Sequence, residues 1–518
     1  MVSRIRLAIP WFLTLVSLLV IISCGSSDSS SPLPETVPRF ECTPCKHALV
    51  PNSTTECGYL IVPENHGKPN GKTIKVYVGI FKNPNGASST EPVFYLIGGP
   101  GAATTDAFTL FEDTSPGNYF RHTFGDNRDI VVIDQRGTNN SYPALYCSEE
   151  LGPLRSQVYG IGFRDAAALR IKAFLTCYNR FKNEGIDLSA FDTFENASDI
   201  KDLARTLGYQ KINIYSASYG TRLAMQMMKH YPEVIQSVVL DSILPPEINP
   251  FEHETFGVLY SFRSFFDAAK NEYPLLEPRF YEMLEELDAN PVDVTGHHYD
   301  SSGNPADAIV VNVSGDKLVS FLVAELKQTP YDAALPEKIN AMYATGDYAA
   351  VADAWISNMD FFFPDGGPGS GSPSVGMYNC VFSADDIYYT SPDRIRQIIH
   401  QNVSSTAIAS YLETFFIDME PGILGKWPVE PLPFHESDPL VSDIPTLMLV
   451  GSLDNATPAI FSEPSAAYLS NSYYFSILAG HSTAYLECVD QMINRFLKAP
   501  DTPPENTCLT EYQWAEGS

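Results

Sequence analysis

An apolar segment that changes into a helical pattern runs from Ile212 to Tyr231 and reads I-N-I-Y-S-A-S-Y-G-T-R-L-A-M-Q-M-M-K-H-Y. The change falls at Ser216-Ala217-Ser218-Tyr219-Gly220, which is G-x-S-x-G with Ser216 in place of the first glycine. Such a sharp turn holds a serine hydroxyl clear of the backbone, beside the positive N-terminal end of a helix. The pattern therefore predicts a strand–turn–helix unit with Ser218 as a candidate nucleophile. The alternative is an ordinary unit of this kind with an incidental serine.

Two downstream segments offer the acid and the base that a serine nucleophile needs. The strand pattern at Pro445 to Val450 runs into a loop that contains Asp454, and Tyr474 to Leu478 leads into Ala479-Gly480-His481-Ser482. Serine, acid and histidine in this order, each after a strand, are typical of hydrolases with such a turn. An imidazole must take the serine proton, and a buried carboxylate must hold the imidazole in its correct tautomer. We therefore expect His481 to be the general base, rather than an exposed loop histidine, and Asp454 the triad acid.

A glycine-rich turn upstream of the serine is the candidate oxyanion site. The strand pattern Val93 to Ile97 ends in Gly98-Gly99-Pro100-Gly101, where the backbone can approach a bound carbonyl closely. We expect the backbone N–H groups of Gly99 and Tyr219 to bind the oxyanion, with Gly98 as the substitute for Gly99. Such a turn alone is more often loop punctuation, so the prediction depends on its place one strand–helix unit before the serine.

A further pattern, Asp134-Gln135-Arg136-Gly137-Thr138, follows the short strand at Asp129 to Ile133. Combined with the glycine turn, the serine turn and the Asp454 and His481 segments, it resembles the prolyl and tripeptidyl aminopeptidases of the α/β-hydrolase superfamily. The likeness is greatest to the secreted bacterial tripeptidyl-aminopeptidase type and runs from about Cys57 to about Cys488. It implies an α/β-hydrolase fold, a mostly parallel central sheet flanked by helices. It also implies a serine exopeptidase that releases residues or short peptides from free peptide N-termini through an acyl-enzyme, with Arg136 shaping the site outside the chemistry.

Two departures from the family pattern bear on substrate preference more than on mechanism. Members of the family usually have glycine where Ser216 and Asn139 stand. Two alternatives stay open: a carboxylesterase or lipase-like hydrolase of the same fold, and a catalytically silent surface binding protein. The intact Ser218, Asp454 and His481 argue against the silent protein. No phosphate-binding loop or dinucleotide fingerprint is present in the sequence, and we expect neither a metal nor another cofactor.

The length of 518 residues, with 44% hydrophobic content, is more than one minimal hydrolase domain needs and predicts an inserted domain. We assign residues 1–23 to a signal peptide, 24–40 to a Ser/Pro-rich tether, 41–245 to the first part of the hydrolase core, 246–443 to a cap domain and 444–518 to the C-terminal part of the core. Helical spacing predicts a mainly helical cap, with helices at Tyr260–Ala269, Tyr281–Leu287, Asp316–Leu326, Pro336–Ala344 and Tyr348–Asn358.

A cap of this kind limits substrate length and, in an aminopeptidase, must carry a carboxylate for the substrate's ammonium group. Glu252, Glu254 and Glu272 are candidates, and the sequence does not distinguish among them. Peptides are therefore the expected substrates, whereas the oligomeric state stays open.

The N-terminus predicts export. Arg4 and Arg6 precede an apolar run from Leu7 to Ile22, as in a signal peptide. Ile21-Ile22-Ser23-Cys24 matches the bacterial pattern in which cleavage leaves a lipidated cysteine, so we expect Cys24 to carry a lipid anchor and to be the only attachment to the membrane. The expected location is the cell envelope of a bacterium, in the outer membrane and periplasm or on the cell surface. An uncleaved anchor and an ordinary secretory signal are the alternatives.

Charge and cysteine content agree with an exported protein. The formal net charge of −29 argues against a nucleic-acid partner, because phosphate binding needs a basic surface. Besides Cys24, eight cysteines remain, and an even number in an exported chain predicts disulfides. The suggested pairs are Cys147 with Cys177 and Cys488 with Cys508, while zinc binding by Cys42-x-x-Cys45 is the alternative for that pair.

Overall fold

The computed structural model describes residues 36–46, 55–83, 91–105, 124, 127–299 and 304–512. The expected signal peptide, Cys24 and most of the expected tether lie outside these residues. Within the described ranges, no helix combines the length and the apolar character that crossing a bilayer requires.

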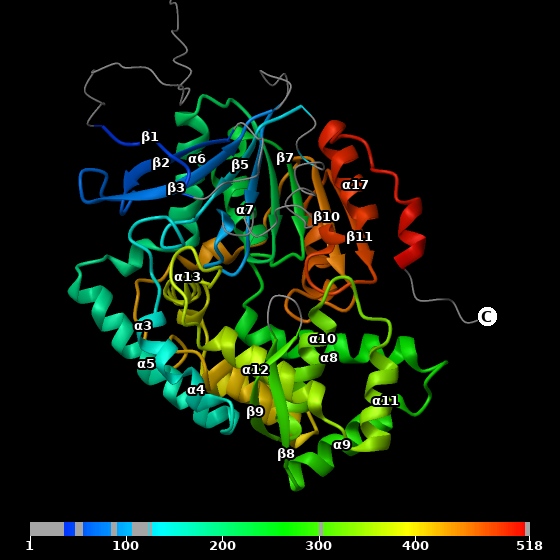
Figure 1. The fold of residues 1–518 in the computed structure, drawn as a ribbon. Coiled ribbons are helices and arrows are strands. Elements are labelled where there is room, and N and C mark those ends of the chain that lie inside the picture. Colours follow the sequence, from blue (N-terminus) through cyan, green and yellow to red (C-terminus); the bar gives the residue numbers. More distant parts are fainter. Residues whose placement is uncertain are drawn as a thin grey trace, which may run out of the picture.

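A nine-stranded sheet forms the centre of the molecule (Figure 1). Its order is β1-β2-β3-β5-β4-β6-β7-β10-β11, with antiparallel pairing from β1 to β5 and parallel pairing from β5 to β11. The carboxyl ends of the parallel strands therefore share one edge, where ligands bind in open α/β sheets. The strands are β1 (Arg39–Thr43), β2 (Thr55–Pro63), β3 (Thr73–Phe81), β4 (Val93–Leu96), β5 (Ile130–Ile133), β6 (Ile212–Ala217), β7 (Ile235–Asp241), β10 (Thr446–Gly451) and β11 (Ser472–Ile477).

Helices cover both faces of this sheet, because successive strand side chains point to opposite sides. On β4, Phe94 and Leu96 pack in one core, with α6 (Thr193–Thr206) and α7 (Tyr219–His230). Their neighbours Val93 and Tyr95 pack in a second core, with α17 (Glu487–Lys498), which Figure 1 shows beside β10 and β11. This arrangement confirms the predicted fold class.

The region between β7 and β10 is mainly helical and lies below the sheet in Figure 1. Four of the five segments predicted to be helical lie within its helices α8 to α11, and the fifth, Tyr348–Asn358, begins one residue before α12. The region also contains an antiparallel hairpin of β8 (Val292–Tyr299) and β9 (Pro305–Val313), which the sequence analysis did not predict. The helices are α8 (Pro250–Ala269), α9 (Leu276–Ala289), α10 (Gly315–Lys327), α11 (Leu335–Thr345), α12 (Ala349–Phe362), α13 (Val375–Asp385), α14 (Pro392–Asn402) and α15 (Thr406–Glu413).

A long helix from the first part of the chain closes one side of this helical region. In α5 (Phe163–Asn183), the Arg170 guanidinium donates to the carbonyl oxygens of Phe362 at 3.1 Å and Met419 at 2.6 Å. Shorter helices lie before α5 and after β10, namely α3 (Ser148–Leu151), α4 (Arg155–Val158) and α16 (Ala459–Ser462). Helix α5, which precedes β6 in the chain, thus packs against the helical region between β7 and β10.

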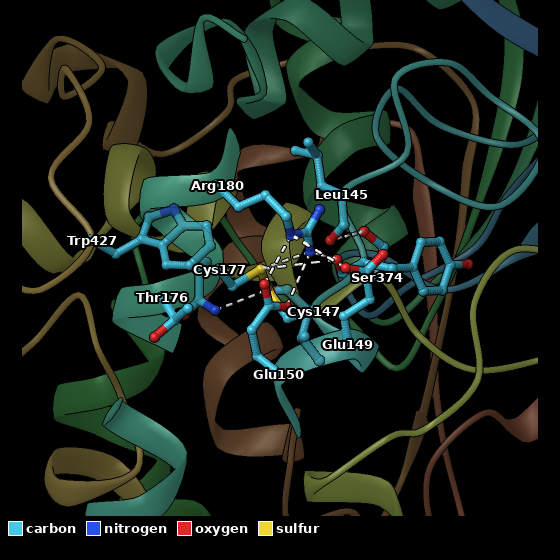
Figure 2. Close-up of a disulfide and its surroundings, with 12 residues drawn as sticks. Leu145, Cys147, Glu149, Glu150, Thr176, Cys177, Arg180, Ser374 and Trp427 are labelled. Atoms are coloured by element: carbon cyan, nitrogen blue, oxygen red, sulfur yellow. Dashed lines mark hydrogen bonds and ion pairs between the residues drawn. A yellow bond between two sulfur atoms is a disulfide. The ribbon is translucent and has the colours of Figure 1, made fainter. Parts of the chain in front are cut away.

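Three disulfides lie within the described residues. Cys147–Cys177 links the start of α3 to α5, and Figure 2 shows it beside Arg180, which forms an ion pair with Glu150 at 2.8 Å. This pairing and Cys488–Cys508 confirm the two suggested disulfides. Cys45 pairs with Cys57, and this excludes the zinc alternative for the Cys42-x-x-Cys45 pair.

One described cysteine, Cys380, lies outside the disulfides. Its thiol is free and buried, and it accepts a hydrogen bond from the Trp427 indole at 3.3 Å. An apolar interior can hold an isolated thiol as a small hydrophobic side chain, so an even number does not by itself imply complete pairing.

A buried ion network fixes the loop after β5. Arg136 is fully buried and binds the two carboxylate oxygens of Asp199 at 2.8 and 2.7 Å. His66, which follows β2, contacts Glu195 at 2.5 Å and Asp202 at 3.2 Å. Burial alone lowers the pKa of His66, but hydrogen bonds to Asp202 and Glu195 and the charge of Asp199 outweigh it and raise the pKa to about 9.

His66 should therefore make the stability of the fold depend on pH. A raised folded-state pKa contributes stability that is complete below the unfolded value of about 6.5 and is lost as the pH rises through about 9. The corresponding free energy is roughly 3 kcal/mol. We expect His66→Gln to lower the free energy of urea unfolding by this order at pH 6 and by much less at pH 10. The exposed His400→Gln is the control, and an equal loss at both pH values would contradict the assignment.

Candidate active site

Ser218 stands at the sharp turn between β6 and α7. Its φ of +58° lies in a region that a residue with a side chain adopts only under constraint. The constraint comes from hydrogen bonds on both sides: Ser218 N–H donates to the Asp241 carbonyl at 3.0 Å, and the Ser218 carbonyl accepts from Thr221 N–H at 2.9 Å. The serine therefore precedes the first turn of α7, as the sequence pattern predicts.

Close backbone approach explains the residues around the serine. A Cβ atom on Gly220 would lie 2.2 Å from the Leu96 carbonyl oxygen, so only glycine fits there. Ser216, which replaces the usual first glycine, is fully buried, and its hydroxyl donates to the Val239 carbonyl at 2.8 Å. The polar atom that Ser216 brings into the core is thus satisfied by the neighbouring strand, and the turn tolerates the substitution.

The structure brings Asp454 and His481 together. The Asp454 carboxylate is fully buried, and its Oδ2 lies 2.8 Å from His481 Nδ1. Its Oδ1 accepts hydrogen bonds from the backbone N–H groups of Ala456 and Thr457 at 2.9 and 3.0 Å, and its Oδ2 also accepts from the Thr457 hydroxyl at 2.8 Å.

These contacts fix the charge of the acid and the tautomer of the base. Burial opposes ionisation of Asp454, but the charge of His481 and the hydrogen bonds from His481 and Thr457 together hold the pKa of the carboxyl well below its usual range. Because an ionised carboxylate only accepts hydrogen bonds, Nδ1 of His481 carries the proton. Nε2 is then the nitrogen that is able to take a proton from a serine hydroxyl.

Asp241, at the end of β7, links the serine turn to the histidine loop. Its carbonyl binds Ser218 N–H, while its fully buried carboxylate accepts from Thr483 N–H at 2.8 Å, Ala484 N–H at 3.0 Å and the Tyr215 hydroxyl at 2.9 Å. The sequence analysis missed this residue. The available signal was an acidic side chain directly after an apolar strand, Val238-Val239-Leu240, that neighbours the candidate nucleophile.

The glycine turn after β4 lies against the serine. A Cβ atom on Gly98 would lie 2.5 Å from Ser218 Cβ and 3.0 Å from its Oγ. Gly99 follows with a φ of +113°, which a residue with a side chain rarely adopts. Tyr219 begins α7, where backbone N–H groups have no partner within the helix. The structure therefore places both predicted oxyanion segments next to Ser218, and the individual donors stay predictions.

A family model for the alpha/beta hydrolase fold matches residues 117–487. The chain belongs to the alpha/beta hydrolase fold family. It is 23% identical over 490 residues to the serine protease Hip1 of Mycobacterium tuberculosis, which covers 90% of this chain and 89% of that protein. It is also 24% identical over 352 residues to the tripeptidyl aminopeptidase of Streptomyces lividans, covering 64% of this chain and 59% of the relative. The putative hydrolase YuaR of Escherichia coli is 24% identical over 285 residues, 51% of each chain.

The protein is therefore a serine hydrolase of the α/β fold, distantly similar to proteins named as peptidases. In this hydrolase a nucleophile candidate, a glycine turn and a hydrogen-bonded acid–histidine pair lie beyond the carboxyl ends of β4, β6, β10 and β11. Such a constellation is suited to acyl transfer, in which a serine attacks a carbonyl and amides hold the oxyanion.

Replacing Asp454 with asparagine should separate chemistry from folding. The amide keeps the shape of the side chain but favours the wrong imidazole tautomer, so kcat on a small acyl ester should fall by about 10³–10⁴-fold with little change in KM. Stopped-flow or steady-state assays with a chromogenic ester measure this loss. The control is Asp443→Asn, an exposed carboxylate just before β10. Turnover within tenfold of wild type in Asp454→Asn would show that another group orients His481.

Proposed function

We propose that this hydrolase is a serine exopeptidase that releases residues or short peptides from free peptide N-termini. Ser218 attacks the scissile carbonyl while His481 takes its proton, and the Gly99 and Tyr219 amides hold the oxyanion. The imidazolium, stabilised by Asp454, then gives its proton to the leaving amine. Water releases the acyl group from Ser218 in the second half of the reaction. Peptide substrates and lipid attachment at Cys24 in the bacterial envelope are parts of the same proposal.

The observation that supports an exopeptidase is the state of one carboxylate, that of Glu254 on helix α8. Glu254 is only partly buried, and it forms no hydrogen bond or ion pair with any of the described residues. Burial raises its pKa to about 8, with the charges of Glu420 and Asp454 acting in the same direction and that of Lys327 opposing. A carboxylate held in this way is suited to accept a cation from the substrate.

A second acidic side chain, Glu420, adds to the negative potential around Glu254. It is buried, and burial raises its pKa to about 7 against the opposing charge of Arg170. One oxygen, Oε1, lies 3.4 Å from the Tyr378 hydroxyl, and the other has no hydrogen-bond partner in the part of the chain that the structure describes. Two neighbouring carboxyl groups with spare acceptor atoms suit an ammonium group, which has three donors to satisfy.

The position of this acidic pair relates it to the catalytic centre. Gly257, one turn after Glu254, packs so closely on the Asp454 loop that a Cβ atom would lie 2.7 Å from the Asn455 carbonyl. Tyr378 belongs to α13, whose first residues pack on the glycine turn: a Cβ atom on Gly101 would lie 3.5 Å from Tyr378 N. Both acidic residues therefore belong to parts of the chain that contact catalytic loops: Glu254 lies on the helix that packs on the acid loop, and Glu420 contacts Tyr378, whose helix packs on the glycine turn.

The other two candidates from the sequence analysis fit the role less well. Glu252 is already occupied, because its carboxylate forms an ion pair with Arg394 at 2.8 Å. Glu272 lies in the exposed turn between α8 and α9, away from the catalytic loops. Glu254 is therefore the proposed site for the substrate's amino terminus.

Paired substrates test the function directly. We expect the soluble form that begins after Cys24 to release a fluorophore from peptides with a free N-terminus and not from their N-acetylated counterparts. The Ser218→Ala variant should release none, which assigns the activity to this serine. Turnover of a simple acyl ester with neither peptide would make the protein an esterase, and no turnover of any substrate would favour the silent binding protein.

Removing the charge of Glu254 should affect binding of the amine. In Glu254→Gln, KM for free-amine peptides should rise by about 10- to 100-fold, the effect of losing one charge-assisted hydrogen bond, with kcat little changed. KM for an acyl ester should not change. Glu272→Gln is the matched control, and an equal rise in KM for the ester would show that Glu254 acts on the site as a whole.

The pH dependence of kcat/KM should also show whether Glu254 binds the amino group of the peptide. Since the pKa of Glu254 is about 8 in the free protein, its ionised form increases as the pH rises to that value. The amino group of the peptide loses its charge above a pKa of about 8. For free-amine peptides kcat/KM should therefore pass through a maximum near pH 8. Glu254→Gln should lose the part of the rising limb that belongs to this carboxyl, and the pH profile of ester turnover, which follows the general base alone, should be the same in the variant and in wild type.

A further inference from the structure

The cap contacts the backbone of the histidine loop directly. Helix α10 ends at Lys327, and the Lys327 carbonyl accepts a hydrogen bond from His481 N–H at 2.9 Å. The next carbonyl, of Gln328, accepts from Gly480 N–H at 3.1 Å. Carbonyl groups at the end of a helix have no partner within it, so the histidine loop satisfies acceptors that the cap would otherwise leave open. Figure 1 shows α10 at the side of the cap that faces β10 and β11.

Gly480 makes this approach possible. A Cβ atom at this position would lie 2.4 Å from the Gln328 carbonyl oxygen and 2.5 Å from Lys327 C, both of them backbone atoms that a side-chain rotation does not move. The φ of Gly480 is not in the left-handed region, so alanine is compatible with its backbone conformation. The glycine is required by the contact between cap and loop, and not by the turn itself.

The acid loop, which contains Asp454, is held by α10 and by a second helix of the same region, α8. The Asn455 side chain, next to Asp454, is buried and donates to the Val323 carbonyl of α10 at 2.8 Å. The Ser261 hydroxyl of α8 donates to the Leu453 carbonyl on the other side of Asp454 at 2.7 Å. Both neighbours of the acid along the chain are therefore bound to the cap.

We propose that cap helices α8 and α10 are a positioning element for the catalytic acid and base, acting through Gly480 and Asn455. The cap thus takes part in arranging the triad as well as in covering the substrate. A misplacement of about 1 Å in a catalytic group costs on the order of 100-fold in rate. The histidine loop, held by two backbone hydrogen bonds, and the acid loop, held by two side-chain hydrogen bonds, are therefore sensitive to the position of α8 and α10. The inference rests on the Ser218, Asp454 and His481 roles of the proposed function and goes beyond it.

A small fluorophosphonate separates positioning from substrate binding. Ser218 attacks its phosphorus and expels fluoride, and a methyl or ethyl phosphonate is too small to need the amine site on the cap. The second-order rate of labelling therefore measures the reactivity of the serine alone. We expect Gly480→Ala to lower this rate at least tenfold and to lower kcat for an acyl ester by a similar factor, with KM within about twofold of wild type.

Two further variants keep the test decisive. Gly160→Ala is the control, because its Cβ atom would meet nothing closer than 3.6 Å and its φ is also outside the left-handed region. Asn455→Ala removes the side-chain hydrogen bond to α10 without introducing a clash. Like Gly480→Ala, it should lower the second-order rate of labelling. This variant decides the question if Gly480→Ala has a lower melting temperature than wild type.

The outcomes distinguish this inference from the proposed function. Labelling of wild type but not of Ser218→Ala, with slow labelling of Gly480→Ala and Asn455→Ala, supports positioning by the cap. Wild-type labelling rates in both variants, with only KM for peptides raised, would overturn it and leave the cap as a cover for the substrate. Failure of wild type itself to be labelled would instead contradict the catalytic role of Ser218.

Discussion

The hydrogen bonds of the buried residue Asp241 connect the two parts of the site, the serine turn and the histidine loop. The serine turn and the histidine loop come from segments more than 250 residues apart, and both are bound to the end of β7. Among the described residues the Asp241 carboxylate has no basic partner, and its acceptor atoms bind two amides and two hydroxyls, from Thr483, Ala484 and Tyr215. Burial raises its pKa and these bonds oppose the effect, so the loop geometry depends on every donor being in place.

Short sequence patterns predict the elements whose formation depends on residues close together in the chain. The parallel strands and helices α8 to α12 follow from apolar periodicity, and the serine turn follows from small residues where the backbone must pass closely. The positions of Asp454 and His481 were predictable because each residue follows a strand of the parallel part of the sheet. The carboxyl ends of these strands lie at the same edge as the serine turn. In this family, chain order then supplies the roles.

The features that escaped prediction depend on tertiary contacts. Asp241 resembles any acidic residue after a strand until the histidine loop folds onto it. Glu252 and Glu254 are two residues apart on α8 and equivalent in sequence, and only Arg394, more than a hundred residues later, makes them different. The hairpin of β8 and β9 was missed because its strands are largely exposed and its apolar contacts depend on α12, where Gly296 packs on Ala352 and Ile356.

The charge of the catalytic acid also affects the proposed amine site. Asp454 must be ionised to orient His481, and its negative charge is one of the influences that raise the pKa of Glu254 to about 8. The resting site therefore holds a largely protonated carboxyl near neutral pH, which limits the repulsion between the two acids. A peptide ammonium reverses the balance, because it stabilises ionised Glu254 and expels the proton as it binds. A blocked N-terminus brings no positive charge and leaves that carboxyl neutral. In the proposed exopeptidase, discrimination between free and acetylated peptides then follows from the burial of Glu254 and from the negative charges around it, Asp454 among them. The helix that carries Glu254 also packs on the acid loop, through Gly257 and Ser261.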